Sequence, residues 1–311
     1  MSMNTGQVRV VDPILSDHAR GYQNADFVGG ALFPQVWMPT RGAKRIEFDR
    51  ASFKRRRTRR APGAPIATLE FGYEGKNVNL HQEALSGVVP IEHKDEAQAV
   101  PHIDLQQDAL DTVLAVIALE KEIQQAGVAR NAASYAASNK AALAGDSKWS
   151  DPDSDPKTQV FDSKEVIRKR IGRRPNTLVL AGGLTSALGK HPKIIQHFAY
   201  TNSSSITIPM LANYFDVQNV VSGDAIYDLQ DGTTVDVWGG DAILAYVAPS
   251  TSGRRNMALP SYGYTYELLN HPLVEAARYD ADIRSWKNDV IDEFSAELVG
   301  PDAGFLFQDA L

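Results

Sequence analysis

The residues that most often hold metal ions are scattered along this sequence. Seven histidines stand at positions 18, 81, 93, 102, 191, 197 and 271. No two of them have the i, i+4 spacing that places two imidazoles on one helical face to bind zinc. In Glu92-His93-Lys94-Asp95-Glu96 a single histidine lies among charged residues, which is typical of a solvated edge. The sequence therefore predicts no zinc site.

Three aspartates have the every-second-residue spacing of a calcium-binding loop. They are Asp151, Asp153 and Asp155, and Asp162 falls at the twelfth position of such a loop. The sixth position, where the sharp turn requires glycine, is Pro156, and the bidentate glutamate is missing. A turn rich in aspartate and proline explains the pattern better, so we predict no metal site here.

Signatures of catalysis and of nucleotide binding are missing from the sequence. There is no GxSxG elbow, Walker loop or GxGxxG fingerprint, and Gly182-Gly183-Leu184 lacks the further glycines of a phosphate cradle. The chain has no cysteine, which excludes disulfides, thiolate metal sites and a cysteine nucleophile. Nothing singles out a pair of carboxylates for acid–base work. We predict no catalytic residues and no cofactor.

Charge is the most informative property of the sequence. Residues 41–60 contain ten basic residues against Glu47 and Asp49, which gives this basic segment a net charge of +8. Because the whole chain carries −6, the remaining residues carry −14. The ten basic residues are Arg41, Lys44, Arg45, Arg50, Lys54, Arg55, Arg56, Arg57, Arg59 and Arg60.

A cationic segment on an anionic body binds either a foreign polyanion such as nucleic acid or the acidic surface of another copy of the chain. Nucleic-acid binding alone predicts disorder or a small basic domain. Here the charges lie on a predicted hairpin within a large acidic protein of 311 residues. We therefore favour a contact between copies, and predict that all ten basic residues contribute to it, with DNA binding as the alternative.

The elements that must carry these residues follow from periodicity. Residues 1–40 show no clear period and predict an extended arm. Residues 44–80 alternate on both sides of a basic run and a Pro-Gly breaker, which predicts a long β-hairpin. Apolar residues then recur at helical spacing from Asp104 to about Asn131, and Asp104 with Gln107 forms a capping box. This predicts one long helix. No apolar run approaches the roughly 20 residues of a membrane span.

The second half predicts a compact α/β unit. Trp149 to Pro156 reads as a turn with an anchoring tryptophan, and Asp162 and Glu165 are expected to cap a short helix that ends at Gly172. The residues after 262 are expected to return as strands to the long helix. The further predicted elements are strands at 176–181, 217–221, 234–238, 242–247 and 283–298, and helices after Gly182, broken at Pro192, and at 209–215.

The order of elements, together with several stretches, resembles the major capsid proteins of tailed bacteriophages, a fold shared with encapsulin nanocompartments. The likeness covers nearly the whole chain and accumulates without one decisive motif. The similar stretches are Asp12–Phe33, Arg60-Ala61-Pro62-Gly63, Trp149–Pro156, Gly172–Val179 and Pro260–Tyr266.

This resemblance implies an α+β fold with named parts. Residues 1–40 would be the N-terminal arm and residues 41–80 the E-loop, a hairpin that reaches over an adjacent subunit. Residues 81–159 would form the peripheral domain with its spine helix at 104–131. Residues 160–255 would form the axial domain, and residues 256–311 would return to the peripheral domain.

The resemblance also implies a function. We expect a structural protein, not an enzyme, that assembles with copies of itself into pentamers and hexamers of an icosahedral virion shell around double-stranded DNA, without specific DNA binding, in the host bacterial cytoplasm. Since the arm begins within a few residues of Met1, a separate scaffolding protein, or none, is expected, with a portal and a possible decoration protein. An encapsulin-type compartment and an Arg-rich DNA-binding protein are the alternatives.

Overall fold

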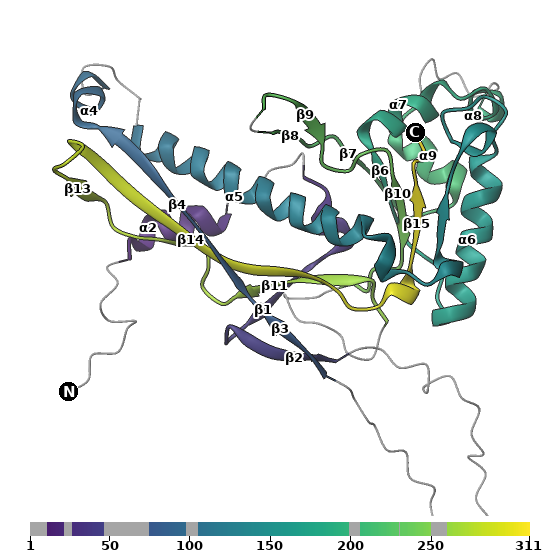
Figure 1. The fold of residues 1–311 in the computed structure, drawn as a ribbon, viewed down its shortest axis with the longest axis horizontal. Helices are drawn as coiled ribbons and strands as arrows, with labels where there is room; N and C mark the ends of the chain where they lie inside the picture. Colours follow the sequence, from purple (N-terminus) through teal and green to yellow (C-terminus); the bar gives the residue numbers. More distant parts are fainter. Residues whose placement is uncertain are drawn as a thin grey trace, which may run out of the picture.

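A computed structural model of the chain describes residues 11–21, 27–46, 75–97, 105–198, 206–229, 231–249 and 260–311. Two β-sheets lie at either side of one long helix, α5 (Leu105–Arg130), which runs across most of the molecule (Figure 1). The helix agrees with the prediction to within one residue at each end. Its predicted cap, Asp104, lies outside the described residues.

The first sheet is built around the long strand β14 (Ser285–Leu298). Strand β4 (His81–Pro90) pairs with β14 antiparallel along its whole length, from His81 opposite Phe294 to Pro90 opposite Ser285. The other side of β14 pairs in turn with three strands. These are β11 (Gly263–Leu268), which also pairs with β1 (Gln35–Met38), β12 (Leu273–Val274) and β13 (Arg278–Asp280).

The second sheet has five strands in the order β5-β15-β10-β6-β7. Strand β6 (Thr177–Ala181), which lies between β10 and β7, has the sequence TLVLA and is buried throughout, as expected for a strand covered on both faces. Figure 1 shows helices gathered around this sheet. The other strands are β5 (Lys140–Ala142), β7 (Asn219–Gly223), β10 (Ala242–Ala245) and β15 (Gly304–Gln308), and the helices are α6 (Pro156–Ile171), α7 (Gly182–Lys190), α8 (Pro192–His197) and α9 (Ile208–Phe215).

Helix α5 belongs to both cores. Leu110 and Ile117, in its first half, pack with Val290 and Phe294 of β14. Ala126, in its second half, joins the larger core around the five-stranded sheet. That core also contains the predicted anchor Trp149, which is fully buried and whose indole nitrogen donates to Gln159. The helix therefore couples the two sheets mechanically.

Two antiparallel ribbons stand away from the sheets. Strand β2 (Gly42–Ile46) pairs with β3 (Gly75–Asn79), and these strands confirm the base of the predicted hairpin. Strand β8 (Ile226–Asp228) pairs with β9 (Thr234–Asp236). In Figure 1 the first ribbon lies below the layer of α5 and the second lies above it. The rest of the predicted hairpin, residues 47–74, lies outside the described residues.

The prediction of an extended arm is wrong for residues 13–21 and 27–38. They form α2 (Pro13–Gly21), α3 (Gly29–Leu32) and β1, and Leu32 and Phe33 are fully buried in the larger core. Elements this short give little periodic signal in the sequence. They are stabilised by tertiary contacts more than by local propensity, so the sequence alone does not mark them. The start of the arm, residues 1–10, lies outside the described residues.

Two further boundaries differ from the predictions. Helix α6 begins at Pro156, six residues before Asp162, because Asp155 is its N-cap and accepts a hydrogen bond from the Thr158 amide at 3.1 Å. The five-stranded sheet includes β5 and β15, which lie outside the predicted 160–255 unit. Long-range strand pairing of this kind leaves no local signal. The remaining helical segments are α4 (Ile91–Ala97) and short 3₁₀ turns at Ala132–Ser134, Ala137–Asn139, Gly145–Ser147 and Pro301–Ala303.

Candidate functional site

The root of the basic segment is fixed by an ion pair within the chain. The Arg41 guanidinium donates from Nε and Nη2 to the two carboxylate oxygens of Glu293, each at 2.6 Å. The Glu293 side chain is only 1% exposed, whereas that of Arg41 is 67% exposed. The hydrogen bond to Glu293 and the attraction of its charge raise the pKa of Arg41 above its usual value. The contact of Arg41 with another subunit stays a prediction, because this ion pair occupies only one edge of an exposed side chain.

The other predicted contact residues are placed only in part. Lys44 is exposed on β2 opposite Asn77, and Arg45 follows it on the same strand. The remaining predicted residues, Arg50, Lys54, Arg55, Arg56, Arg57, Arg59 and Arg60, lie outside the described residues. Their role as intersubunit contacts stays a prediction.

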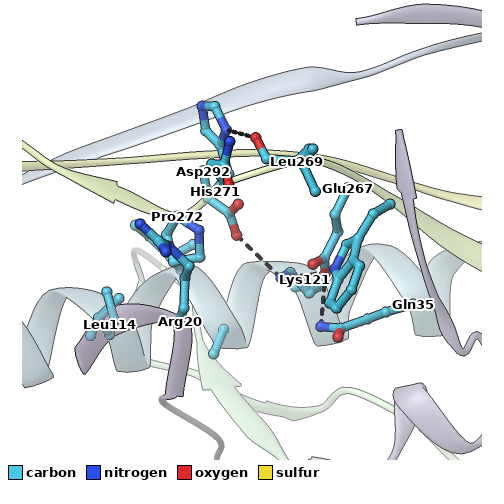
Figure 2. A pocket seen from close by; sticks show the side chains of 14 residues that line it. Arg20, Gln35, Leu114, Lys121, Glu267, Leu269, His271, Pro272 and Asp292 are labelled. Carbon is cyan, nitrogen blue, oxygen red and sulfur yellow. Dashed lines mark hydrogen bonds and ion pairs between the residues drawn. The ribbon is translucent and has the colours of Figure 1, made fainter. Parts of the chain in front are cut away.

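A buried charge cluster joins α5 to the six-stranded sheet (Figure 2). The Lys121 ammonium lies 2.9 Å from Glu267 Oε1 and 3.1 Å from Asp292 Oδ2. Burial lowers the pKa of Lys121, but the two carboxylates outweigh it and the net shift is upward. Burial raises the pKa of Glu267, the positive charge of Lys121 lowers it, and the negative charge of Asp292 raises it. The cluster ties β11 and β14 to α5 by ion pairs.

A cavity of about 330 Å³ opens beside this cluster, between α2, β1 and α5. Trp37 and Leu269 line it and are 54% and 49% exposed. His271 also lines it, with its Nδ1 3.3 Å from the Leu269 carbonyl oxygen (Figure 2). Within the residues that the structure describes, no group of three or more histidine, aspartate and glutamate side chains could hold a metal ion. The cavity combines exposed apolar side chains with the ion-paired residues Lys121, Glu267 and Asp292.

A buried carboxylate that sequence reasoning missed ties the N-terminal segment to the core. Glu122 accepts hydrogen bonds from the Val28 and Gly29 amides at 3.0 and 2.8 Å and from the Trp238 indole nitrogen at 2.7 Å. Burial raises the pKa of Glu122, although the three donors oppose that shift. A Cβ on Gly29 would overlap Gln125 Oε1 and lie 2.7 Å from this carboxylate, so a larger residue would displace both side chains. In the sequence, the one sign of this site is an acidic residue among the apolar positions of the predicted long helix.

Comparison with known proteins shows which family the chain resembles. No protein-family model matches the sequence. The major capsid protein of Burkholderia phage BcepMu is 33% identical over 302 residues, which cover 96% of this chain and 96% of that protein. The chain belongs to the phage major capsid protein family. The major capsid protein of Pseudomonas phage JBD67 is 25% identical over 309 residues, 97% of each chain.

Solved structures give the same result for this capsid protein. A phage-related protein of Bordetella bronchiseptica RB50 is 41% identical, with a TM-score of 0.82 over 97% of this chain and 98% of its own. The capsid of cyanophage P-SCSP1u (TM-score 0.56, 9% identity, 99% and 92% coverage) shares the fold. So does a virus-like particle from Pyrococcus furiosus (TM-score 0.54, 10% identity, 94% and 96% coverage). The predicted α+β capsid fold is confirmed.

The chain is therefore a structural protein of a phage capsid that assembles with copies of itself. Among the described residues, no helix is long and apolar enough to cross a membrane. The site that matters for such a protein is a surface that meets another copy, and the β2–β3 ribbon that begins beside Arg41 is the candidate for it.

Proposed function

We propose that this major capsid protein closes into pentamers and hexamers of an icosahedral shell around double-stranded DNA, and that it catalyses no reaction. The six-stranded sheet with α5 would be the peripheral domain, and the five-stranded sheet with α6–α9 the axial domain around the symmetry axes. Residues 41–80 would be the E-loop. Assembly would take place in the host cytoplasm with a separate scaffolding protein and a portal, and a decoration protein is a further possible partner.

One observation carries this proposal: the basic segment of net charge +8 extends from a ribbon root whose Arg41 is anchored by a buried glutamate. This ion pair fixes the start of the β2–β3 ribbon, from which the basic segment continues. Because ten cations close together repel one another, the segment is stabilised by an acidic surface. The rest of each copy carries −14 and supplies that surface. Many weak contacts repeated in a closed shell then add up to a stable particle.

The alternatives make different predictions. An encapsulin-type compartment has fold likeness alone behind it, whereas both curated relatives are phage capsid proteins. A DNA-binding role for the basic segment would require it to contact phosphates. Inside a shell, an anionic inner wall does not adsorb DNA, so we expect neighbouring copies to neutralise the basic segment.

Replacing Arg55, Arg56 and Arg57 with alanine tests the proposal. The triple variant is expected to remain folded but to form shells only at a concentration several-fold higher than the wild-type chain, judged by sedimentation and negative-stain images. A matched control removes three exposed cations elsewhere, Lys169, Arg173 and Arg174, and is expected to assemble normally. Normal shells from the triple variant, with weakened DNA binding, would instead favour the DNA-binding alternative.

A further inference from the structure

The ribbon formed by β8 and β9 carries a concentration of negative charge. Residues 224–236, the acidic ribbon, contain Asp224, Asp228, Asp231 and Asp236 and no lysine or arginine. Ile226 pairs with Asp236 and Asp228 with Thr234, and the two strands form a sheet of their own. Figure 1 shows this ribbon standing away from the five-stranded sheet, above α5.

Within the residues that the structure describes, no lysine or arginine neutralises the charges of the acidic ribbon. Asp228 Oδ1 accepts from the Thr234 hydroxyl at 2.6 Å, and Asp231 Oδ1 accepts from the Thr233 amide at 2.9 Å. In the part of the chain that the structure describes, none of the four aspartates has a lysine or arginine partner. By contrast Asp241, a few residues further, lies 2.6 Å from Arg130 Nε. Among the described residues, the ribbon therefore presents exposed negative charge that has no cationic partner.

The acidic ribbon also presents apolar surface. Its root is anchored, because Ala225 and Val237 are buried and joined by a backbone hydrogen bond of 3.0 Å. Further out, Ile226 is 55% exposed and Leu229 is 43% exposed. A two-stranded ribbon with exposed apolar side chains is marginally stable alone in water. Charge and exposed apolar area together indicate that a cationic partner covers it.

We infer that the acidic ribbon binds the basic segment, residues 41–60, of a neighbouring copy. The basic segment carries +8, and the four aspartates balance half of that charge. The methylene stems of arginine and lysine would cover Ile226 and Leu229 while their charged ends pair with the aspartates. The rest of the positive charge faces the acidic body around the ribbon.

The positions of the two ribbons make this contact a ring-forming one. The β2–β3 root and the β8–β9 ribbon lie on opposite sides of the subunit (Figure 1). Each copy can therefore offer the basic segment to the next copy and the acidic ribbon to the previous one. Such a head-to-tail contact generates a closed ring when the rotation between copies closes. This inference rests on the proposed function and adds the receiving surface to it.

Cross-linking in assembled shells tests the contact directly, because the chain has no native cysteine. Leu229→Cys is combined in turn with Lys54→Cys, Arg55→Cys, Arg56→Cys and Arg57→Cys, and the shells are oxidised. At least one pair is expected to give a non-reducing ladder of covalently linked copies, ending at five or six. The single variant Leu229→Cys is the control and is expected to give no ladder.

The outcomes separate this inference from the proposed function. Shells that form with no ladder from any of the four pairs, or with a disulfide inside one copy only, would overturn the contact and leave the proposed function standing. A wild-type chain that never forms shells would overturn both.

Neutralising the ribbon gives an independent measurement. The variant with Asp228, Asp231 and Asp236 changed to asparagine is expected to need about threefold or more higher concentration to form shells, as weak pairs act together. The matched control changes three other exposed aspartates, Asp146, Asp153 and Asp162, to asparagine and alters net charge equally. Equal shell formation by both variants would overturn the inference.

Discussion

The carboxylate of Glu122 is held by N–H donors from segments that lie far from it in the sequence. Glutamine has only one acceptor oxygen, so Glu122→Gln would turn an amide NH₂ towards an N–H donor. We expect a loss of about 1–3 kcal/mol in the free energy of unfolding. The measurement is urea denaturation of the unassembled subunit. Glu120→Gln, two residues away on the exposed side of α5, should change little; equal losses would contradict the role of Glu122.

Asp155 gives a prediction that depends on pH. A hydrogen bond from the Thr158 hydroxyl, followed by one from its amide, lowers the pKa of Asp155 below its ordinary value of 3.8. Its capping contribution is therefore complete above the ordinary pKa and is lost as pH falls through the lowered, folded-state pKa. At neutral pH, Asp155→Ala should cost about 1 kcal/mol of unfolding free energy.

Asparagine supplies the control for this prediction, because it caps helices but does not titrate. Asp155→Asn should keep most of the stability at neutral pH, and its difference from Asp155→Ala should persist in acid. The wild-type advantage over Asp155→Ala should disappear there. Denaturant unfolding at both pH values measures this, and a pH-independent wild-type advantage would contradict it.

Single residues show where sequence analysis succeeds. Trp149 was predicted as an anchor because a tryptophan in a polar turn has few other roles, and it is fully buried. The ion pair of Arg41 with Glu293 was not predicted, because Glu293 lies 252 residues away and no local pattern marks the pair. Glu122 was missed for the same reason.

At the scale of elements, the buried face of α5 is the part that the sequence predicts best. Leu110 is fully buried against Val113, Val290 and Phe294, whereas Val116 on the same helix is 49% exposed. Leu110→Asp should prevent folding of the subunit, because it buries a carboxylate without a partner at a cost of several kcal/mol. Val116→Asp should leave a soluble, helical subunit. Circular dichroism and soluble yield measure both; a folded Leu110→Asp variant would contradict the placement of this face.

The helices that were predicted well are either long or bounded by a proline. Helix α5 runs for 26 residues, so its period stands out, and α7 and α8 are separated by Pro192 as expected. Helix α3 has four residues and β12 has two, which is too few for a period. Their structure is set by burial against distant strands, and so the fold of residues 13–21 and 27–38 could not be derived locally.

At the scale of the whole molecule, the net charge of −6 conceals two opposed concentrations of charge. The basic segment and the negative total were visible in the sequence, and they were enough to favour contacts between copies. The acidic ribbon was not singled out, because its four aspartates are spaced over residues 224–236 and become one surface only when β8 pairs with β9.

The dependence of assembly on salt follows from this charge distribution. Diffuse repulsion between copies of net charge −6 opposes assembly and is relieved by salt, whereas contact between the basic segment and the acidic ribbon favours assembly and is weakened by salt. The Debye length is about 10 Å at 0.1 M salt and about 3 Å at 1 M. Repulsion spread over a 34.0 kDa subunit acts over longer distances and is already largely screened at 0.1 M.

At 0.1 M salt, charges in close contact are still only partly screened. Further salt therefore mainly weakens the attraction between the basic segment and the acidic ribbon. The concentration needed to form shells should therefore rise between 0.1 and 1 M salt, a range over which screening shortens from about 10 to about 3 Å. Light scattering of the wild-type chain measures this, and the asparagine variant of Asp228, Asp231 and Asp236 should show a shallower rise. A threshold that falls with salt would mean that repulsion between whole subunits outweighs the attraction between their ribbons.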